Sequence, residues 1–157
     1  MTAVAVEPAL HVREAAAADL AAVNDLHRRC SVRTLCSRYH AGRDRLTAAE
    51  WERMVDPVLG HTLLLADPDG LLVGFANVVR VSDSTAEVSL LLHDDWQDAG
   101  VGRAMSWRLV SYARRLGFAD IVAWVEPDNR RAVSLLRGAG ALPDFREPGE
   151  IRWALRL

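Results

Sequence analysis

A glutamine and two glycines that follow an apolar run form the first pattern in this sequence that could support chemistry. Gln97, Gly100 and Gly102 are spaced as Gln-x-x-Gly-x-Gly, directly after the apolar segment that begins at Glu87. The apolar run predicts a strand, and apolar residues at three- and four-residue intervals over 101–116 predict a helix. The first N–H groups of a helix have no partner, and the helix dipole favours negative charge there. Because glycine has no Cβ, a pyrophosphate can approach this part of the main chain closely.

Other phosphate and metal chemistries do not fit the sequence. A dinucleotide fingerprint needs a third glycine, but Arg-Ala-Met follows Gly102. A Walker lysine is missing as well, because all 19 basic residues are arginine. Cys30 and Cys36 have no histidines at metal-ligand spacing, so we expect two ordinary thiols and no metal site.

The elements that would position this pattern are those of an α+β domain. The turn sequence Asp67-Pro-Asp-Gly70 predicts a hairpin, so three antiparallel strands precede the glycines. The strand–helix–strand unit that follows requires a parallel pairing, which implies a mixed sheet with helices on both faces. We expect His27 at a helix surface. Trp107 lies off the apolar stripe of its helix; we expect it to pack, with a self-association patch as the alternative. The predicted strands cover 10–13, 61–66, 71–81, a run from 87, 120–125 and 151–157, and the predicted helices cover 16–29, 32–39, 101–116, 130–137 and a segment from the capping box Thr47-Ala-Ala-Glu50 to Asp56.

Length and composition limit the function classes. The 157 residues are enough for one domain (10–157) after a flexible leader (1–9). A formal net charge of −2 gives no case for a nucleic-acid partner or an anionic membrane. The N-terminus has no signal-peptide pattern and no apolar run approaches the roughly 18 residues of a membrane span, so we expect a cytoplasmic protein.

Two blocks of the sequence, taken together, resemble one known protein family. The run from Ala86 to Gly102 resembles the fourth strand and pyrophosphate loop of the GNAT family of N-acetyltransferases. Glu126-Pro-Asp-Asn129-Arg-Arg-Ala132, with Gly140 further on, resembles the second motif of that family. Within the family, the chain looks most like the acetyltransferase domain of bacterial Pat-type protein lysine acetyltransferases, and the segment 33–39 fits that subgroup too.

The resemblance implies a GNAT-like sheet, acetyl-CoA as cosubstrate, and direct transfer of the acetyl group to a primary amine in a ternary complex. The acceptor would be a protein lysine or a small-molecule amine, and the chain would be a monomer or a homodimer. Asn129 would bind the pantetheine arm; the plain alternative is a helix N-cap, and both roles are compatible. The implied cofactor-binding residues are Leu90, Leu91, Leu92, Gln97, Asp98, Ala99, Gly100, Val101, Gly102, Arg103, Ala104, Asn129 and Ala132.

The resemblance also implies catalytic groups. Only the unprotonated amine attacks, so a carboxylate is wanted as general base; Glu87 matches the family glutamate, with Glu126 as the alternative. A backbone N–H from the segment 90–92, for which we take Leu91, would stabilise the oxyanion at a β-bulge. Leu136 stands where many members have a tyrosine acid, so no general acid is assigned.

Two alternatives stay open at this stage. The chain could be a non-catalytic acyl-CoA-binding sensor or interaction module, which the leucine at position 136 favours and the retained Glu87 disfavours. The basic residues Arg38, His40, Arg43 and Arg45 form either a solvated loop or a wall that recognises an acidic partner. Asp98 would repel a pyrophosphate if it pointed inward, so we expect it to point to solvent.

Overall fold

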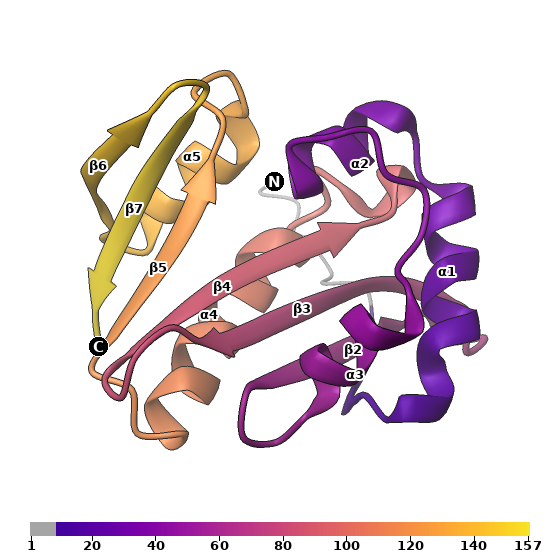
Figure 1. The fold of residues 1–157 in the computed structure, drawn as a ribbon. Coiled ribbons are helices and arrows are strands. Elements are labelled where there is room, and N and C mark those ends of the chain that lie inside the picture. The colour runs from indigo at the N-terminus through magenta and orange to yellow at the C-terminus, as the bar shows by residue number, and fades with distance from the viewer. Residues whose placement is uncertain (1–8) are drawn as a thin grey trace, which may run out of the picture.

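Seven strands form one sheet in the order β1-β2-β3-β4-β5-β7-β6 in the computed structural model, which describes residues 9–157 (Figure 1). Every neighbouring pair is antiparallel except β4 and β5, which are parallel, as the strand–helix–strand unit predicted. The predicted leader lies outside the described residues except for Ala9. The strands are β1 (His11–Glu14), β2 (Gly60–Ala66), β3 (Leu72–Arg80), β4 (Thr85–Leu92), β5 (Asp120–Val125), β6 (Leu142–Glu147) and β7 (Glu150–Arg156).

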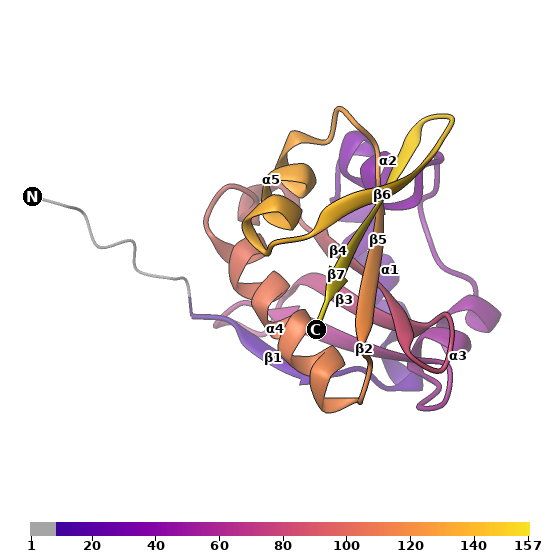
Figure 2. The ribbon, with the colours of Figure 1, turned by 90° about the vertical axis from the view of Figure 1, so that its left-hand side faces the viewer.

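Helices cover both faces of this sheet, so the predicted α+β fold class is confirmed. One face carries α1, α2 and α3, and the other carries α4 and α5 (Figures 1 and 2). None of the described helices is long and apolar enough to cross a membrane. The helices are α1 (Leu20–Arg29), α2 (Val32–Tyr39), α3 (Ala48–Val55), α4 (Val101–Arg115) and α5 (Arg130–Gly138), with short 3₁₀ turns η1 (Ala17–Asp19) and η2 (Asp94–Trp96).

Local sequence signals explain where these elements begin. The Ser31 hydroxyl accepts a hydrogen bond from the Thr34 N–H at the start of α2. Thr47 and Glu50 form the predicted capping box of α3, since the Glu50 carboxylate accepts from the Thr47 N–H at 2.8 Å and the Thr47 hydroxyl accepts from the Glu50 N–H. Gly70 adopts a φ of 87° in the hairpin between β2 and β3, a conformation that only glycine takes without strain.

The core lies on both sides of β3 and β4. Side chains of β3 are buried from Leu72 to Val78 because helices cover both faces of that strand. Along β4 the side chains alternate: Leu92 packs with the α4 core, whereas Leu91 packs with the core beneath α1, α2 and α3. This alternation places Glu87 and Ser89 on the same face as Leu91.

Two sequence expectations were wrong, and one strand was missed. His27 is buried rather than at a surface, and its ring nitrogens contact the Val23 carbonyl and the Tyr39 hydroxyl. Trp107 is 50% exposed on α4 rather than packed. The strand β6 was not predicted, because all six of its side chains are exposed and its sequence therefore shows no burial pattern.

Candidate active site

The strands β4 and β5 separate after a short parallel contact. They pair over three positions, of which the last is Glu87 opposite Val122. Beyond this point β4 is paired only with β3, and β5 is paired only with β7 (Figure 1). One edge of β4 therefore has no strand partner beyond Val88, in the middle of the sheet. We call the segment 88–92 with the first turn of α4 the donor edge.

The direction of the main-chain groups along this edge follows from the hydrogen bonds at its two ends. The Thr85 carbonyl accepts from β3 through Val81, and the His93 N–H donates to Val73 of β3. Backbone direction alternates along a strand, so odd-numbered residues of β4 face β3 and even-numbered residues face the open edge. The Leu92 carbonyl agrees with this, because it accepts from the Gln97 side chain at 2.9 Å rather than from β3.

This geometry changes the expectation for the Leu91 N–H and overturns the expected β-bulge. The Leu91 carbonyl lies against Gly74 of β3, so the Leu91 main-chain groups are turned away from the open edge. The N–H groups at the edge belong to Leu90 and Leu92. The expected β-bulge is absent, because the register of β4 against β3 runs without a shift from Leu92 to Ala86. The edge is freed by the departure of β5 instead.

The first turn of α4 lies where the pyrophosphate site was predicted. Gly100 has a φ of 83° and the first helical bond runs from the Ala104 N–H to its carbonyl. The N–H groups of 101–103 therefore have no intrahelical partner. A Cβ on Gly102 would lie 3.2 Å from Leu135 Cδ1, so this glycine lets α5 pack closely beside the turn.

Gln97 and Asp98 are both engaged with other side chains. The Gln97 amide donates to the Leu92 carbonyl and, at 3.0 Å, to the Thr34 hydroxyl, so it fixes the elbow between β4 and α4. Asp98 is exposed, as expected, and it forms an ion pair with Arg131 at 2.7 Å. Hydrogen bonding from Arg131 lowers the pKa of the Asp98 carboxyl. Arg131 was not predicted as a site residue.

An apolar cavity lies between the sheet and the helices α4 and α5, next to the donor edge. Leu136 is part of its wall, so this position offers no proton donor. Asn129 caps α5 by accepting from the Ala132 N–H at 3.2 Å; its role toward a cofactor stays a prediction. These three features match the three parts of an acyl-CoA. The apolar cavity suits the thioester arm, the unpaired strand edge suits the amides, and the helix N-terminus suits the pyrophosphate. The cavity is lined by Val88, Ser106, Leu109, Val110, Ile121, Val122, Ala123, Leu135, Leu136, Ala139, Ala141, Trp153 and Leu155.

A group of charged side chains that includes Arg38, His40 and Glu87 lies on the opposite face of the sheet. His40, at the end of α2, adopts a left-handed φ of 56° and places Nδ1 3.0 Å from Glu150 Oε1 and 3.7 Å from Glu126 Oε1. Burial raises the pKa of the half-buried Glu87, while the charge of Arg38 opposes that rise. We call Arg38, His40, Glu87, Glu126 and Glu150 the charged cluster.

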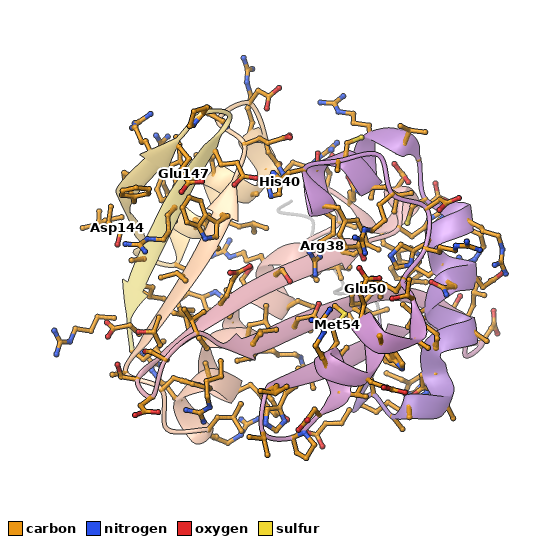
Figure 3. All side chains as sticks on the ribbon, in the orientation of Figure 1. Arg38, His40, Glu50, Met54, Asp144 and Glu147 are labelled. Carbon is orange, nitrogen blue, oxygen red and sulfur yellow. The ribbon has the colours of Figure 1, made fainter. Side chains whose placement is uncertain are left out.

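The cluster draws on segments far apart in the sequence. Arg38 and His40 come from α2, Glu87 from β4, and Glu126 and Glu150 follow β5 and open β7. The basic residues that were predicted to act together therefore have different surroundings. Arg43 pairs with Glu50 of α3, whereas Arg38 and His40 point toward the strands (Figure 3). The sequence signalled the basic residues, but it gave no sign that Glu126 and Glu150 would meet them.

A mixed sheet whose parallel strands part beside a helix N-terminus, with a half-buried carboxylate at the fork, defines an acyl-CoA-dependent transferase. The chain belongs to the acetyltransferase (GNAT) family, which matches residues 20–141. It is an acetyl-CoA-dependent N-acetyltransferase, and solved structures of the same fold include complexes with CoA and with acetyl-CoA.

Two curated relatives and one solved structure are similar over most of the chain. An L-methionine sulfoximine/L-methionine sulfone acetyltransferase of Salmonella typhimurium is 28% identical over 82% of this chain and 78% of its own length. An L-amino acid N-acyltransferase of Escherichia coli is 26% identical over 88% of this chain and 83% of its own. The GNAT domain of S. lividans PAT superposes with a TM-score of 0.86 at 22% identity, covering 94% of this chain and 90% of that domain, which shows the shared fold.

Proposed function

We propose that the protein transfers an acetyl group directly to a primary amine in a ternary complex, with Glu87 as the general base. The observation that carries this proposal is the position of Glu87. It is the last residue of β4 that pairs with β5, so its side chain lies on one face of the sheet beside the start of the donor edge.

Glu87 has the properties that a base for an amine needs. A lysine amine has a pKa of about 10.4 and is protonated at neutral pH, so a proton must leave before or during attack. A carboxylate whose pKa is raised by burial is a better proton acceptor than an ordinary glutamate, because its pKa lies nearer the working pH. Glu126 lies in the same cluster and stays the alternative base.

The donor edge supplies the complementary electrostatics. When bound, acetyl-CoA supplies an acetyl thioester as the acyl donor. The Leu90 N–H would stabilise negative charge on the carbonyl oxygen during attack, and the Leu92 N–H would hold the adjoining amide. The N–H groups of 101–103 would hold the pyrophosphate, with Asn129 beside the pantetheine arm. We assign no general acid, since Leu136 has no proton to give.

The two thiols give no support to a covalent acyl-enzyme. Cys30 is buried, and that burial raises the pKa of its thiol to about 11, so it stays protonated at neutral pH. Cys36 lies on α2 with Cys30 just before it, on the face opposite the apolar cavity. Direct attack by the amine is therefore the simpler route.

The acceptor is a protein lysine or a small-molecule amine. Similarity to curated relatives that act on amino acids supports a small molecule, and the shared fold with a PAT domain agrees with the resemblance to Pat-type enzymes. We favour the small molecule, because the two curated relatives match the chain at higher identity than that domain does.

The test is thiol release from acetyl-CoA with a panel of amines, amino acids and lysine peptides, using wild type and Glu87→Gln. We expect kcat to fall about 100- to 1,000-fold in the variant, because general-base catalysis contributes that much. The dissociation constant for acetyl-CoA should not change. Glu126→Gln is the matched control and should keep kcat within about threefold of wild type.

Three outcomes would contradict the proposal. A Glu87→Gln variant as active as wild type would remove Glu87 from the chemistry, and a collapse in Glu126→Gln alone would move the base there. Tight acetyl-CoA binding without release to any acceptor would favour a non-catalytic sensor of acyl-CoA, which the leucine at position 136 would then explain.

A further inference from the structure

Arg38 carries a positive charge that no carboxylate of residues 9–157 pairs. Arg13, Arg43, Arg131 and Arg152 each form an ion pair with an aspartate or glutamate, but Arg38 forms none. Its Nε is buried without a hydrogen-bond partner, and burial lowers its pKa. A buried charge is costly unless it is paired, so an unpaired guanidinium in the charged cluster requires an explanation.

The guanidinium is held rigidly although it is not paired. Nη2 donates to Asn77 Oδ1 at 3.0 Å, and the guanidinium carbon lies 4.7 Å from the centre of the Tyr39 ring. Both partners are fixed in turn: the Asn77 amide donates to the Thr62 hydroxyl at 2.6 Å, and the Tyr39 hydroxyl contacts His27 Nε2 at 2.6 Å. The remaining terminal nitrogen, Nη1, makes no hydrogen bond within residues 9–157 and is not among their buried unpartnered atoms.

Its position relates it to the proposed base. Arg38 points from α2 toward the strands (Figure 3). Asn77 lies opposite Ser89 in the sheet, and Ser89 is two residues along β4 from Glu87. Two residues of a strand span about 7 Å. The charges of Arg38 and Glu87 also act on each other, since Arg38 lowers the pKa of Glu87 and Glu87 raises that of Arg38.

We propose that Arg38, oriented by Asn77, binds a carboxylate of the acceptor while the acceptor amine lies at Glu87. This inference rests on the proposed function and names the substrate class: amines that carry a carboxylate a few bonds away, as amino acids do. A planar guanidinium matches a carboxylate through two N–H groups, and binding it supplies the partner that the protein lacks. A peptide-bound lysine side chain has no neighbouring carboxylate, so an amino acid fits this pair of groups better.

The test compares each amino acid with its own primary amide as acceptor, with rates expressed per unprotonated amine. In wild type we expect the carboxylate form to have the higher kcat/KM. Arg38→Gln should lower kcat/KM about 100-fold for the carboxylate form and no more than about threefold for the amide, because only the former loses a charged partner. Arg38→Lys keeps the charge without the planar fork, so its loss should be about 10-fold.

Arg45→Gln is the matched control. It removes an exposed arginine from the segment that follows α2, so it tests general attraction of anions to this region. We expect it to change both acceptors by less than about twofold. The dissociation constant for acetyl-CoA, measured for every variant, checks that Arg38→Gln still folds.

Equal losses on the carboxylate and amide forms, together with an acid limb of the pH profile moved to higher pH, would overturn the inference. Arg38 would then act only on the pKa of Glu87. A wild-type preference for amides would overturn it as well.

If no acceptor is acetylated at all, the proposed function fails, and calorimetric binding of the same acceptor pairs to the CoA complex decides the role of Arg38. A carboxylate preference that disappears in Arg38→Gln supports the subsite, and no preference overturns it.

Discussion

The donor edge and the charged cluster share the strand β4, yet they are built by different means. The donor edge uses main-chain groups: the open side of β4 and the first turn of α4. The charged cluster uses side chains that four separate segments bring together. Main-chain groups are the same in every protein, so the donor edge suits a constant ligand. Side chains can be exchanged one at a time, so we expect the cluster to determine the choice of acceptor.

The largest effect that separates the two regions is expected from Gly100→Val. A β-branched residue at a φ of 83° is strained, and relief of that strain would move the N–H groups of 101–103. We expect the dissociation constant for acetyl-CoA to rise about 10- to 100-fold, which corresponds to about 1.4–2.8 kcal/mol. Acceptor selectivity should not change.

Gly70→Val is the control for this prediction. Gly70 has a φ of 87° in the distant hairpin between β2 and β3, so the substitution introduces the same strain away from the donor edge. Calorimetry on both variants distinguishes local from general damage. An equal loss of acetyl-CoA affinity in the two variants would refute a specific role for the α4 turn.

A smaller effect in the opposite direction is expected from Asp98→Asn. Asp98 holds Arg131 beside the turn where the pyrophosphate would bind. Removing the carboxylate frees a cation and removes a repulsive charge, so acetyl-CoA should bind about 2- to 5-fold more tightly at low salt, and the gain should shrink as salt is added. Asp95→Asn, which removes an exposed carboxylate from the same elbow, should change affinity less.

The smallest effect concerns stability and compares two glutamates. Burial raises the pKa of Glu87 above its ordinary value, so the folded state holds the Glu87 proton more tightly than the unfolded state does. The ionised carboxylate is therefore a cost once the pH exceeds that raised pKa. Glu87→Gln should raise the melting temperature by about 1–3 °C at pH 7, and the gain should vanish as the pH falls through the raised pKa.

Glu50 provides the opposite sign. The Thr47 N–H and Arg43 lower the pKa of its carboxyl to about 2, so its stabilisation is present above the ordinary pKa of a glutamate and is lost as the pH falls toward 2. Glu50→Gln should lower the melting temperature by about 2–5 °C at pH 7. Scanning calorimetry across the pH range checks both curves. A Glu87→Gln variant that melts below wild type at pH 7 would show that burial of the ionised Glu87 carboxylate does not destabilise the folded state.

The donor edge was largely predictable from the sequence because main-chain chemistry needs a local pattern. An apolar strand followed by two glycines is visible within one segment, and α4 begins at Val101 as expected. What was not predictable is how β4 is freed. A bulge would lie within β4 itself. The separation of β5 from β4 instead depends on a segment that begins only after α4.

The charged cluster was predictable only in part, because its members meet through the tertiary fold. Glu87 was identified through a resemblance and Arg38 as one of several basic residues. That Asn77 would orient Arg38 could not be read from spacing, since this contact joins β3 and α2. His27 was misjudged for a similar reason: its ring packs against Tyr39 and Phe75 of other elements, which a helix pattern does not reveal.

The short seam between β4 and β5 also has a consequence for how the protein unfolds. Three residue pairs connect the β1–β4 portion of the sheet to β5, β7 and β6, whereas the pairs on either side of the seam are longer. A sheet so divided is expected to exchange its amide hydrogens as two cooperative units rather than one, with β3 the slowest because it is paired along both edges and buried on both faces. An acyl-CoA inserted at the fork would bridge the two units and slow the exchange of both.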